Sequence, residues 1–240
     1  MSSIAGVTRV AHSDREGTGL EAWDPIDPDS LVSGTPVQRG RLDDSDEAAG
    51  YLAGVWDCTA FTGHTEPYPD DEFMLLLEGR LVMRMPDGTA VPVEEGEAFV
   101  IPKGLECQWE QPDYVRKVFM IVSDPVEEAA DNPSLTRITK PDLALGPAEG
   151  TVATAHTWFE NSTARMSVAV EAHAGGEAPG AASPDHELIH VLAGALTLSA
   201  GGAGERIAAG ETVYIRAGTA VARTHAPGTR LVVSRYRPAA

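Results

Sequence analysis

The sequence DDEFMLLLEG, at residues 70–79, recurs as DHELIHVLAG at residues 185–194. In both copies an acidic cluster leads into an apolar run that stops at a glycine. The apolar run has the length and the bounding signals of a single strand. The copies lie 115 positions apart, and a repeat of that length predicts a fold that is built twice in one chain.

The repeat extends to both sides of these two stretches. Its glycines fall at the ends of the expected strands, where a tight turn needs a positive φ or leaves no room for a side chain. The matched pairs are Pro69 with Pro184, Asp70 with Asp185, Glu72 with Glu187, Leu77 with Leu192, Gly79 with Gly194, Leu81 with Leu196 and, after one deletion, Gly96 with Gly210, Glu97 with Glu211, Ile101 with Ile215, Gly104 with Gly218 and Arg116 with Arg230.

The composition predicts an all-β fold. Short apolar runs of five to seven residues alternate with turn signals every 8 to 12 residues, and the chain has 24 Gly and 17 Pro. With 240 residues, each half is long enough for its own core. We expect an N-terminal arm over residues 1–28, a first domain over 29–124, a linker over 125–140 and a second domain over 141–240.

The charge of the chain excludes several classes of partner. The formal net charge is −18, and Lys and Arg form no run that could bind a nucleic acid or an anionic membrane surface. The two cysteines, Cys58 and Cys107, predict no disulfide framework. The N-terminus has no pattern of a secretory leader, and no apolar stretch is long enough to span a membrane. We expect a cytoplasmic protein.

A second motif carries a resemblance to a known family. GEAFVIPKG, at residues 96–104, has the spacing Gly, five residues, Pro, one residue, Gly, and Glu72 lies seven residues before Gly79. These spacings resemble the cupin superfamily, which implies two tandem double-stranded β-helix (jelly-roll) barrels. More narrowly, the first half is similar to the subgroup that includes (S)-ureidoglycine aminohydrolase and the ethanolamine-utilisation cupin.

The resemblance also implies a metal site, which in the resembled enzyme lies in the second barrel, whereas the residues of this chain place it in the first. The positions that hold two His in the first cupin motif hold Glu66 and Tyr68 here, and the His position of the second motif holds Cys107. Ureidoglycine aminohydrolases are similar in having a Glu at the first position, which implies Glu66 and Glu72 as ligands of a divalent metal such as Mn. With Tyr68 and Cys107, the set is unusual for a hard cation.

The same residues also predict a pocket without a metal. Carboxylates that face one apolar barrel raise each other's pKa, which favours acid–base chemistry or an amine-bearing ligand. The alternative is that Asp70 and Glu72 make only structural hydrogen bonds. The candidate residues are Glu66, Tyr68 and Glu72 for catalysis, and Asp70, Cys107 and Trp109 for ligand binding.

Two functions remain open at this point. The first is a small-molecule enzyme, similar to ureidoglycine aminohydrolase, that acts on a small polar and nitrogen-containing metabolite in the first barrel. The second is a metal-free bicupin that binds a ligand or serves as a regulatory scaffold. In the second half only Glu187 of the motif residues survives, so we expect that copy to be structural. In both cases we expect a homodimer, because apolar outer strand faces need cover.

Overall fold

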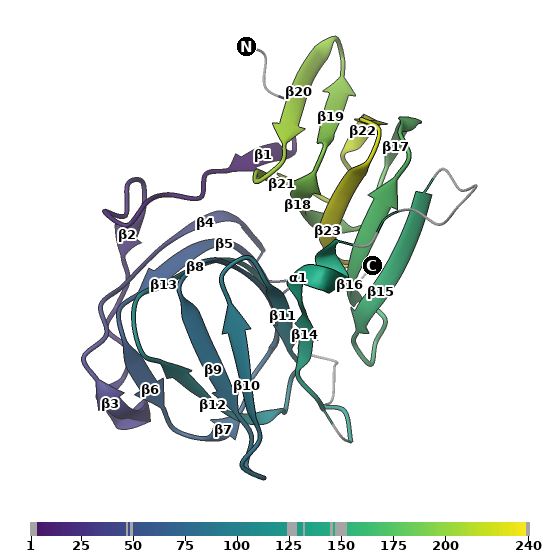
Figure 1. Ribbon diagram of the computed structural model, residues 1–240. Coiled ribbons are helices and arrows are strands. Elements are labelled where there is room, and N and C mark those ends of the chain that lie inside the picture. The colour runs from purple at the N-terminus through teal and green to yellow at the C-terminus, as the bar shows by residue number, and fades with distance from the viewer. Residues whose placement is uncertain are drawn as a thin grey trace. The chain divides into compact units, whose positions relative to one another are not determined.

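The computed structural model describes residues 4–46, 48, 50–123, 129–131, 133–144, 146 and 153–238. It divides into two compact units. One consists of His12–Ile138 and is called the first barrel below. The other consists of Met1–Ala11 with Thr139–Ala240 and is called the second barrel. Both units consist mainly of strands, so the all-β prediction is confirmed (Figure 1).

The first barrel contains the first copy of the repeat. Its elements are β2 (Glu21–Ala22), the 3-10 helix η1 (Pro28–Ser30), β3 (Leu31–Gly34), β4 (Gln38–Asp46), β5 (Tyr51–Cys58), β6 (Phe61–Gly63), β7 (Glu66–Pro67), β8 (Asp71–Glu78), β9 (Arg80–Arg84), β10 (Ala90–Glu94), β11 (Ala98–Ile101), β12 (Glu106–Gln111), β13 (Val115–Val122) and β14 (Thr136–Ile138).

Two antiparallel sheets form the wall of the first barrel. The described strands run in the order β14-β11-β8-β13-β5-β4-β2 in one sheet, and β10-β9-β12-β6-β3 in the other, with β7 beside β12. Figure 1 shows these strands curving around a common interior. Side chains alternate between the two faces of a strand, so every second residue of β8 and β13 points into that interior.

The central strand β8 shows this alternation clearly. Met74 and Leu76 are fully buried and belong to the interior cluster, together with Trp56, Phe99 and Phe119 among others. Glu72 has the same parity as Met74 and Leu76, and it therefore faces the same interior. The strand reads as an almost continuous apolar run because both of its faces are covered.

The second barrel repeats the plan with one large and one small sheet. The orders are β1-β21-β18-β23-β16-β15 and β17-β22-β19-β20. Its elements are β1 (Val7–Val10), α1 (Lys140–Leu143), β15 (Ala153–Glu160), β16 (Met166–His173), β17 (Gly176–Ala182), β18 (His186–Ala193), β19 (Ala195–Ala200), β20 (Ala203–Ala208), β21 (Thr212–Ile215), β22 (Ala220–His225) and β23 (Thr229–Tyr236).

Each barrel completes its larger sheet with a strand from outside the repeat. In the first barrel, β14 pairs with β11, and Arg137 forms a two-pronged ion pair with Glu97, at 3.0 and 2.7 Å to Oε2. In the second barrel, β1 pairs with β21, and Arg9 lies 2.6 Å from Glu211. Glu97 and Glu211 are matched positions of the repeat. The same carboxylate therefore anchors the added strand in both barrels.

These added strands change the expected domain boundaries. The expected arm over residues 1–28 is divided, since β1 belongs to the second barrel while β2 and η1 belong to the first. The expected linker over 125–140 contains β14, and its residues 125–128 and 132 lie outside the described residues. Among the described residues, no helix combines the length and apolar character needed to cross a membrane.

Candidate functional site

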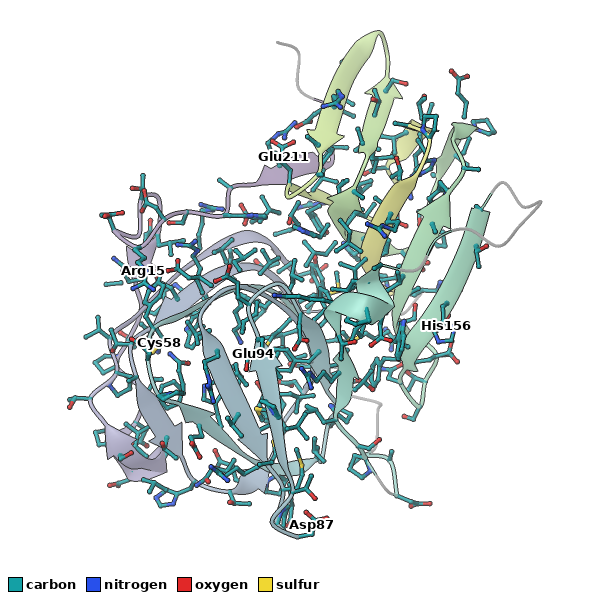
Figure 2. The ribbon with its side chains drawn as sticks, viewed as in Figure 1. Arg15, Cys58, Asp87, Glu94, His156 and Glu211 are labelled. Atoms are coloured by element: carbon teal, nitrogen blue, oxygen red, sulfur yellow. The ribbon has the colours of Figure 1, made fainter. Side chains whose placement is uncertain are left out.

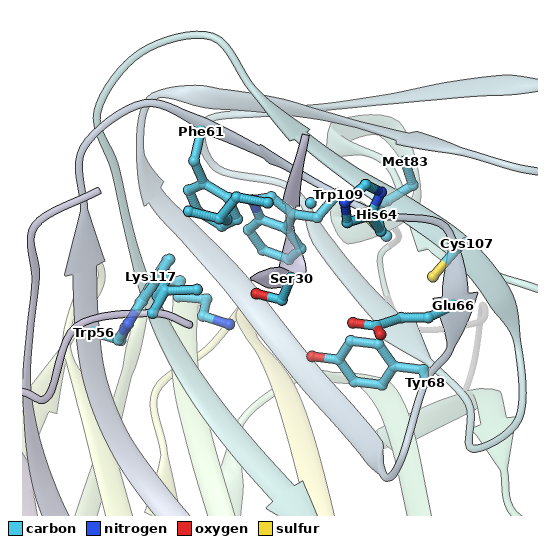
Figure 3. Close-up of a pocket in the computed structure, with 13 residues that line it drawn as sticks. Ser30, Trp56, Phe61, His64, Glu66, Tyr68, Met83, Cys107, Trp109 and Lys117 are labelled. Atoms are coloured by element: carbon cyan, nitrogen blue, oxygen red, sulfur yellow. The ribbon is translucent and has the colours of Figure 1, made fainter. Parts of the chain in front are cut away.

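The interior of the first barrel contains a cavity of about 230 Å³. In Figure 3, Lys117 reaches into it from one side, and Glu66 and Tyr68 reach in from the other. The walls combine aromatic and apolar groups with a few polar ones. The lining residues are Ile26, Ser30, Leu31, Trp56, Phe61, Gly63, His64, Glu66, Tyr68, Met83, Cys107, Trp109 and Lys117.

A buried ion pair lies at the inner end of this cavity. Lys117 Nζ donates to Glu72 Oε1 at 2.7 Å, and the two side chains expose only 9% and 3% of their surface. The strand register produces this contact. Lys117 lies opposite Trp56 on β5 and opposite Leu76 on β8, so its side chain runs inward along the face that also holds Glu72. Met74 Sδ, at 3.0 Å, is a second acceptor for the ammonium group.

Tyr68 occupies the other oxygen of the same carboxylate. Its hydroxyl donates to Glu72 Oε2, so both oxygens of Glu72 accept hydrogen bonds from protein groups. Burial, and next the negative charge of Glu72, raise the pKa of Tyr68 well above its ordinary value. The phenol therefore remains protonated at neutral pH. Two backbone hydrogen bonds hold its segment, from Tyr68 N to Leu105 O at 3.0 Å and from Gly104 N to Tyr68 O at 2.8 Å.

Three aromatic rings surround the ammonium group of Lys117. Nζ lies 4.8 Å from the ring centroid of Trp56, 5.0 Å from that of Trp109 and 5.8 Å from that of Phe119. Trp56 and Trp109 meet edge to face, with an interplanar angle of 89°. Phe61 lies parallel to Trp109, with centroids 6.3 Å apart. A cation inside such a cage is stabilised by the negative faces of the rings.

The rings of the cage are themselves held in place. Trp56 Nε1 donates to Gln38 Oε1 at 2.9 Å, and Trp109 Nε1 donates to Gln111 Oε1 at 3.0 Å. Gln111 is buried and donates in turn to Cys58 O at 2.8 Å. Because each indole N–H has a partner, the ring orientations are fixed before any ligand enters.

The mouth of the cavity carries different groups. Glu66, on β7, is exposed and lies opposite Cys107 on β12. Burial, and next the charge of Glu66, raise the pKa of the Cys107 thiol to about 11. Asp70 is half-buried and is not among the lining residues of the cavity. The structure thus brings five of the six candidate residues, all except Asp70, to the cavity or to the ion pair at its inner end. Their roles remain predictions.

The donor set around Glu72 does not fit the divalent metal that the family resemblance implies. Within the described part of the chain, no three His, Cys, Asp or Glu side chains converge closely enough to hold a metal ion. Lys117 and Tyr68 already occupy both oxygens of Glu72.

Glu187, the matching residue of the second barrel, is held by arginines. It is buried and contacts Arg223 through a two-pronged ion pair, and Arg235 Nε at 3.0 Å. Arg235 also lies 2.5 Å from Glu171. These side chains pair with each other, and the structural role of this copy stays a prediction.

The sequence interpretation missed the residues that define the chemistry of the site. Lys117 and Trp56 were not among the candidates, nor was Phe61. Lys117 had a readable signal, because it has the parity of Phe119 in the strand YVRKVFMIV, whereas the adjacent Arg116 has the opposite parity. A lysine at an inward position of a strand is rarely buried without a counter-charge.

The comparisons with known proteins concern the fold of the two barrels. Residues 46–119 match the model of the EutQ-like cupin domain. The first barrel contains a cupin domain. The match covers β5 to β12 in full, which includes Glu72 on β8, and most of β13. No curated protein matches the chain significantly.

Solved structures are similar over both barrels. A protein of unknown function from Pseudomonas syringae pv. tomato has a TM-score of 0.72 at 20% identity, over 95% of this chain and 98% of that one. A cupin 2 conserved barrel domain protein from Leptotrichia buccalis has a TM-score of 0.63 at 11% identity, over 95% and 100%. A salicylate 1,2-dioxygenase from Pseudaminobacter salicylatoxidans has 0.60 at 10%, over 83% and 76%. The tandem cupin fold is thereby confirmed.

Proposed function

We propose that the first barrel binds a small polar, nitrogen-containing metabolite without the help of a metal ion. The observation that carries the proposal is the cavity of about 230 Å³ with a fixed ammonium group at one side and a carboxylate at the other. Small-molecule sites are largely apolar and preformed, with few polar groups that set orientation. The aromatic walls and the Lys117, Tyr68 and Glu66 side chains meet this description.

The donors and acceptors at the cavity define the ligand. An ammonium group has three N–H donors, and Glu72 and Met74 account for two of those of Lys117. The third is available to an acceptor in the cavity, such as a carboxylate or carbonyl oxygen. At the mouth, the Glu66 carboxylate accepts hydrogen bonds, so it selects an amino, amide or ureido N–H. The ligand therefore has an acceptor at one end and an N–H donor at the other.

Binding is favoured over catalysis by the state of the candidate groups. Tyr68 donates a hydrogen bond to Glu72, and its raised pKa keeps the phenol protonated at neutral pH, so it is no general base. Cys107 is a thiol and not a thiolate, so it is a poor nucleophile. Hydrolysis of a ureido compound, as the family resemblance implies, remains the second candidate. It rests on Glu66 at the mouth of the cavity.

A panel of small compounds tests the proposal. Thermal unfolding is followed with amino acids and ureido acids, with acids that lack nitrogen and with amines that lack a carboxylate. A ligand at 100 times its Kd stabilises by about 2.7 kcal/mol, a shift of several degrees in Tm. We expect the first group to raise Tm, and Glu66→Gln to weaken the effect. Glu106→Gln is the matched control, because Glu106 is exposed and adjacent to Cys107 on β12.

The outcome separates the candidates. If no compound shifts Tm, or if Glu66→Gln and Glu106→Gln respond equally, the proposed site is wrong. Release of ammonia from a ureido compound, lost in Glu66→Gln, would show that the second candidate is correct. The expected homodimer is a separate proposal, and light scattering after size exclusion measures it directly.

A further inference from the structure

Both barrels place a basic side chain against the same inward carboxylate of the repeat. Glu72 is paired with Lys117, and its match Glu187 is paired with Arg223 and Arg235. The basic residues do not come from matched positions, because Arg116 matches Arg230 and Lys117 therefore matches Leu231. Two different side-chain arrangements thus supply a positive charge at the same point of the fold.

The surroundings of Lys117 resemble a binding site for an organic cation more than a general salt bridge. Its Nζ is within 6 Å of three ring centroids, contacts the soft Met74 Sδ and has one carboxylate, Glu72, as its counter-charge. Aromatic faces with one anion suit an alkylammonium ion. A divalent metal ion instead requires several oxygen or nitrogen ligands at short distance.

We infer that Lys117 is a tethered ligand: its ammonium group fills a cation seat formed by Glu72, Trp56, Trp109 and Phe119, and this seat binds a free alkylammonium ion once the Lys117 side chain is cut back. The seat is accessible. Trp56 and Lys117 line both the 230 Å³ cavity and a second cavity of about 130 Å³, which Glu72 and Phe119 also line. Shortening the Lys117 side chain should therefore leave a space that is continuous with both cavities.

The test is chemical rescue of Lys117→Ala. Alanine lacks the last three carbons and the nitrogen of lysine, which together correspond to n-propylammonium. We expect Lys117→Ala to lower Tm because Glu72 loses its counter-charge, and n-propylammonium chloride to raise it again by about 5 °C in a saturable manner, relative to sodium chloride at equal ionic strength. Wild type should not respond.

Two variants are matched controls for this rescue. Lys117→Met keeps a chain of similar length in the seat without the charge, so it should be destabilised but not rescued. Lys140→Ala removes an exposed lysine of α1, and its Tm should not depend on n-propylammonium. In Lys117→Ala with Glu72→Gln, the buried charge is gone, so the response to n-propylammonium should disappear.

Every other result overturns the inference. A Lys117→Ala protein that n-propylammonium does not stabilise, or that Mn²⁺ stabilises more strongly, has no seat for an organic cation. If Lys117→Ala does not fold alone, its refolding from urea should recover native fluorescence only with n-propylammonium, and no recovery contradicts the inference equally. No metabolite enters these experiments, so the proposed function can fail while the cation seat is confirmed, and the reverse also holds.

Discussion

Lys117 Nζ lies 2.7 Å from Glu72 Oε1, and neither side chain exposes more than 9% of its surface. Removing one partner of a buried ion pair leaves the other charge without compensation, which typically costs about 3 to 5 kcal/mol. We expect Glu72→Gln to lower the free energy of unfolding by roughly 3 kcal/mol, since the amide keeps the shape of the carboxylate but not its charge.

Urea unfolding followed by tryptophan fluorescence measures this loss, because Trp23, Trp56 and Trp109 all belong to the first barrel. Glu66→Gln removes the carboxylate at the exposed mouth and should change stability by less than about 0.5 kcal/mol. Equal unfolding midpoints for the two variants would mean that the ion pair contributes nothing to the stability of the barrel.

The sequence predicted the fold better than the site. The repeat identified two cupin-type barrels, and strand parity correctly directed Glu72 inward. Parity fails across strands, however, because it does not say which residues lie opposite each other. Lys117 reaches Glu72 through the register of β13 on β8, which shifts by one residue between Arg116 and Lys117. Such an irregularity follows from packing and leaves no mark in the spacing of the sequence.

The added strands show a similar limit. Arg9 and Arg137 lie in segments with no repeat, 128 positions apart, yet both bind the matched carboxylates Glu211 and Glu97. The repeat placed the two glutamates at equivalent points, so an anchoring role for them could have been inferred. Which distant segment would supply the arginine depends on the path of the chain between barrels, and the local sequence does not encode it.

Gly79, at the end of β8, has a stricter role than the turn glycine Gly88. It has a φ of +86°, and a Cβ there would lie 2.1 Å from Tyr114 O. Gly88, next to Asp87 at the tip of the β9–β10 turn, has a similar φ of +88° but no atom within 4 Å of a Cβ (Figure 2). Alanine brings backbone strain of about 1 kcal/mol at both positions.

Only Gly79→Ala adds a clash with a neighbouring backbone atom. We therefore expect it to be less stable than Gly88→Ala by at least about 2 kcal/mol, because backbone cannot move aside as a side chain can. Urea unfolding of the two variants gives the difference. Equal losses would show that the φ angle alone requires glycine at the end of β8.

Both cysteines of the first barrel should resist alkylation in the native state. Cys58 has no exposed surface, and burial, followed by the charge of Asp57, raises the pKa of its thiol to about 12. The pKa of Cys107 is raised to about 11 by burial and by Glu66. At pH 8 the reactive thiolate is therefore only about one part in a thousand or less.

Mass spectrometry after iodoacetamide treatment tests this state. We expect both thiols to be labelled rapidly in urea and very slowly without it, with Cys107 the faster of the two. Glu66→Gln should speed the alkylation of Cys107 in the native state, since it removes the adjacent negative charge, and should leave the alkylation of Cys58 unchanged. Rapid native labelling of Cys107 would indicate a thiolate and would restore it as a nucleophile or metal ligand.

The second barrel contains a group of side chains that should make it sensitive to acid. His173 and His225 stack with ring centroids 3.7 Å apart, and His173 Nε2 lies 3.3 Å from Glu171. Burial, and next the charge of His173, lower the pKa of His225 to about 4. Burial alone would raise the pKa of Glu171, but His173 and Arg235 outweigh it and lower the pKa to about 2.

Both shifts act in the same direction. A histidine whose pKa falls from 6.5 to about 4 on folding takes up its proton more readily in the unfolded state, so its contribution is complete above pH 6.5 and is lost as pH falls toward 4. The contribution of Glu171 is lost between pH 4.5 and 2. After allowance for solvent screening, we expect His225 to account for about 1 to 2 kcal/mol.

Hydrogen exchange at pH 7 and pH 5 resolves this effect by barrel. Amides of β16 and β22 should lose protection at pH 5 relative to pH 7, after correction for intrinsic exchange, whereas those of β8 and β13 in the first barrel should lose less. In His225→Gln the additional loss should be absent, because glutamine takes up no proton in this range. His156→Gln, on the exposed strand β15, should behave as wild type. Equal loss of protection in His225→Gln and wild type would assign the acid sensitivity to other groups.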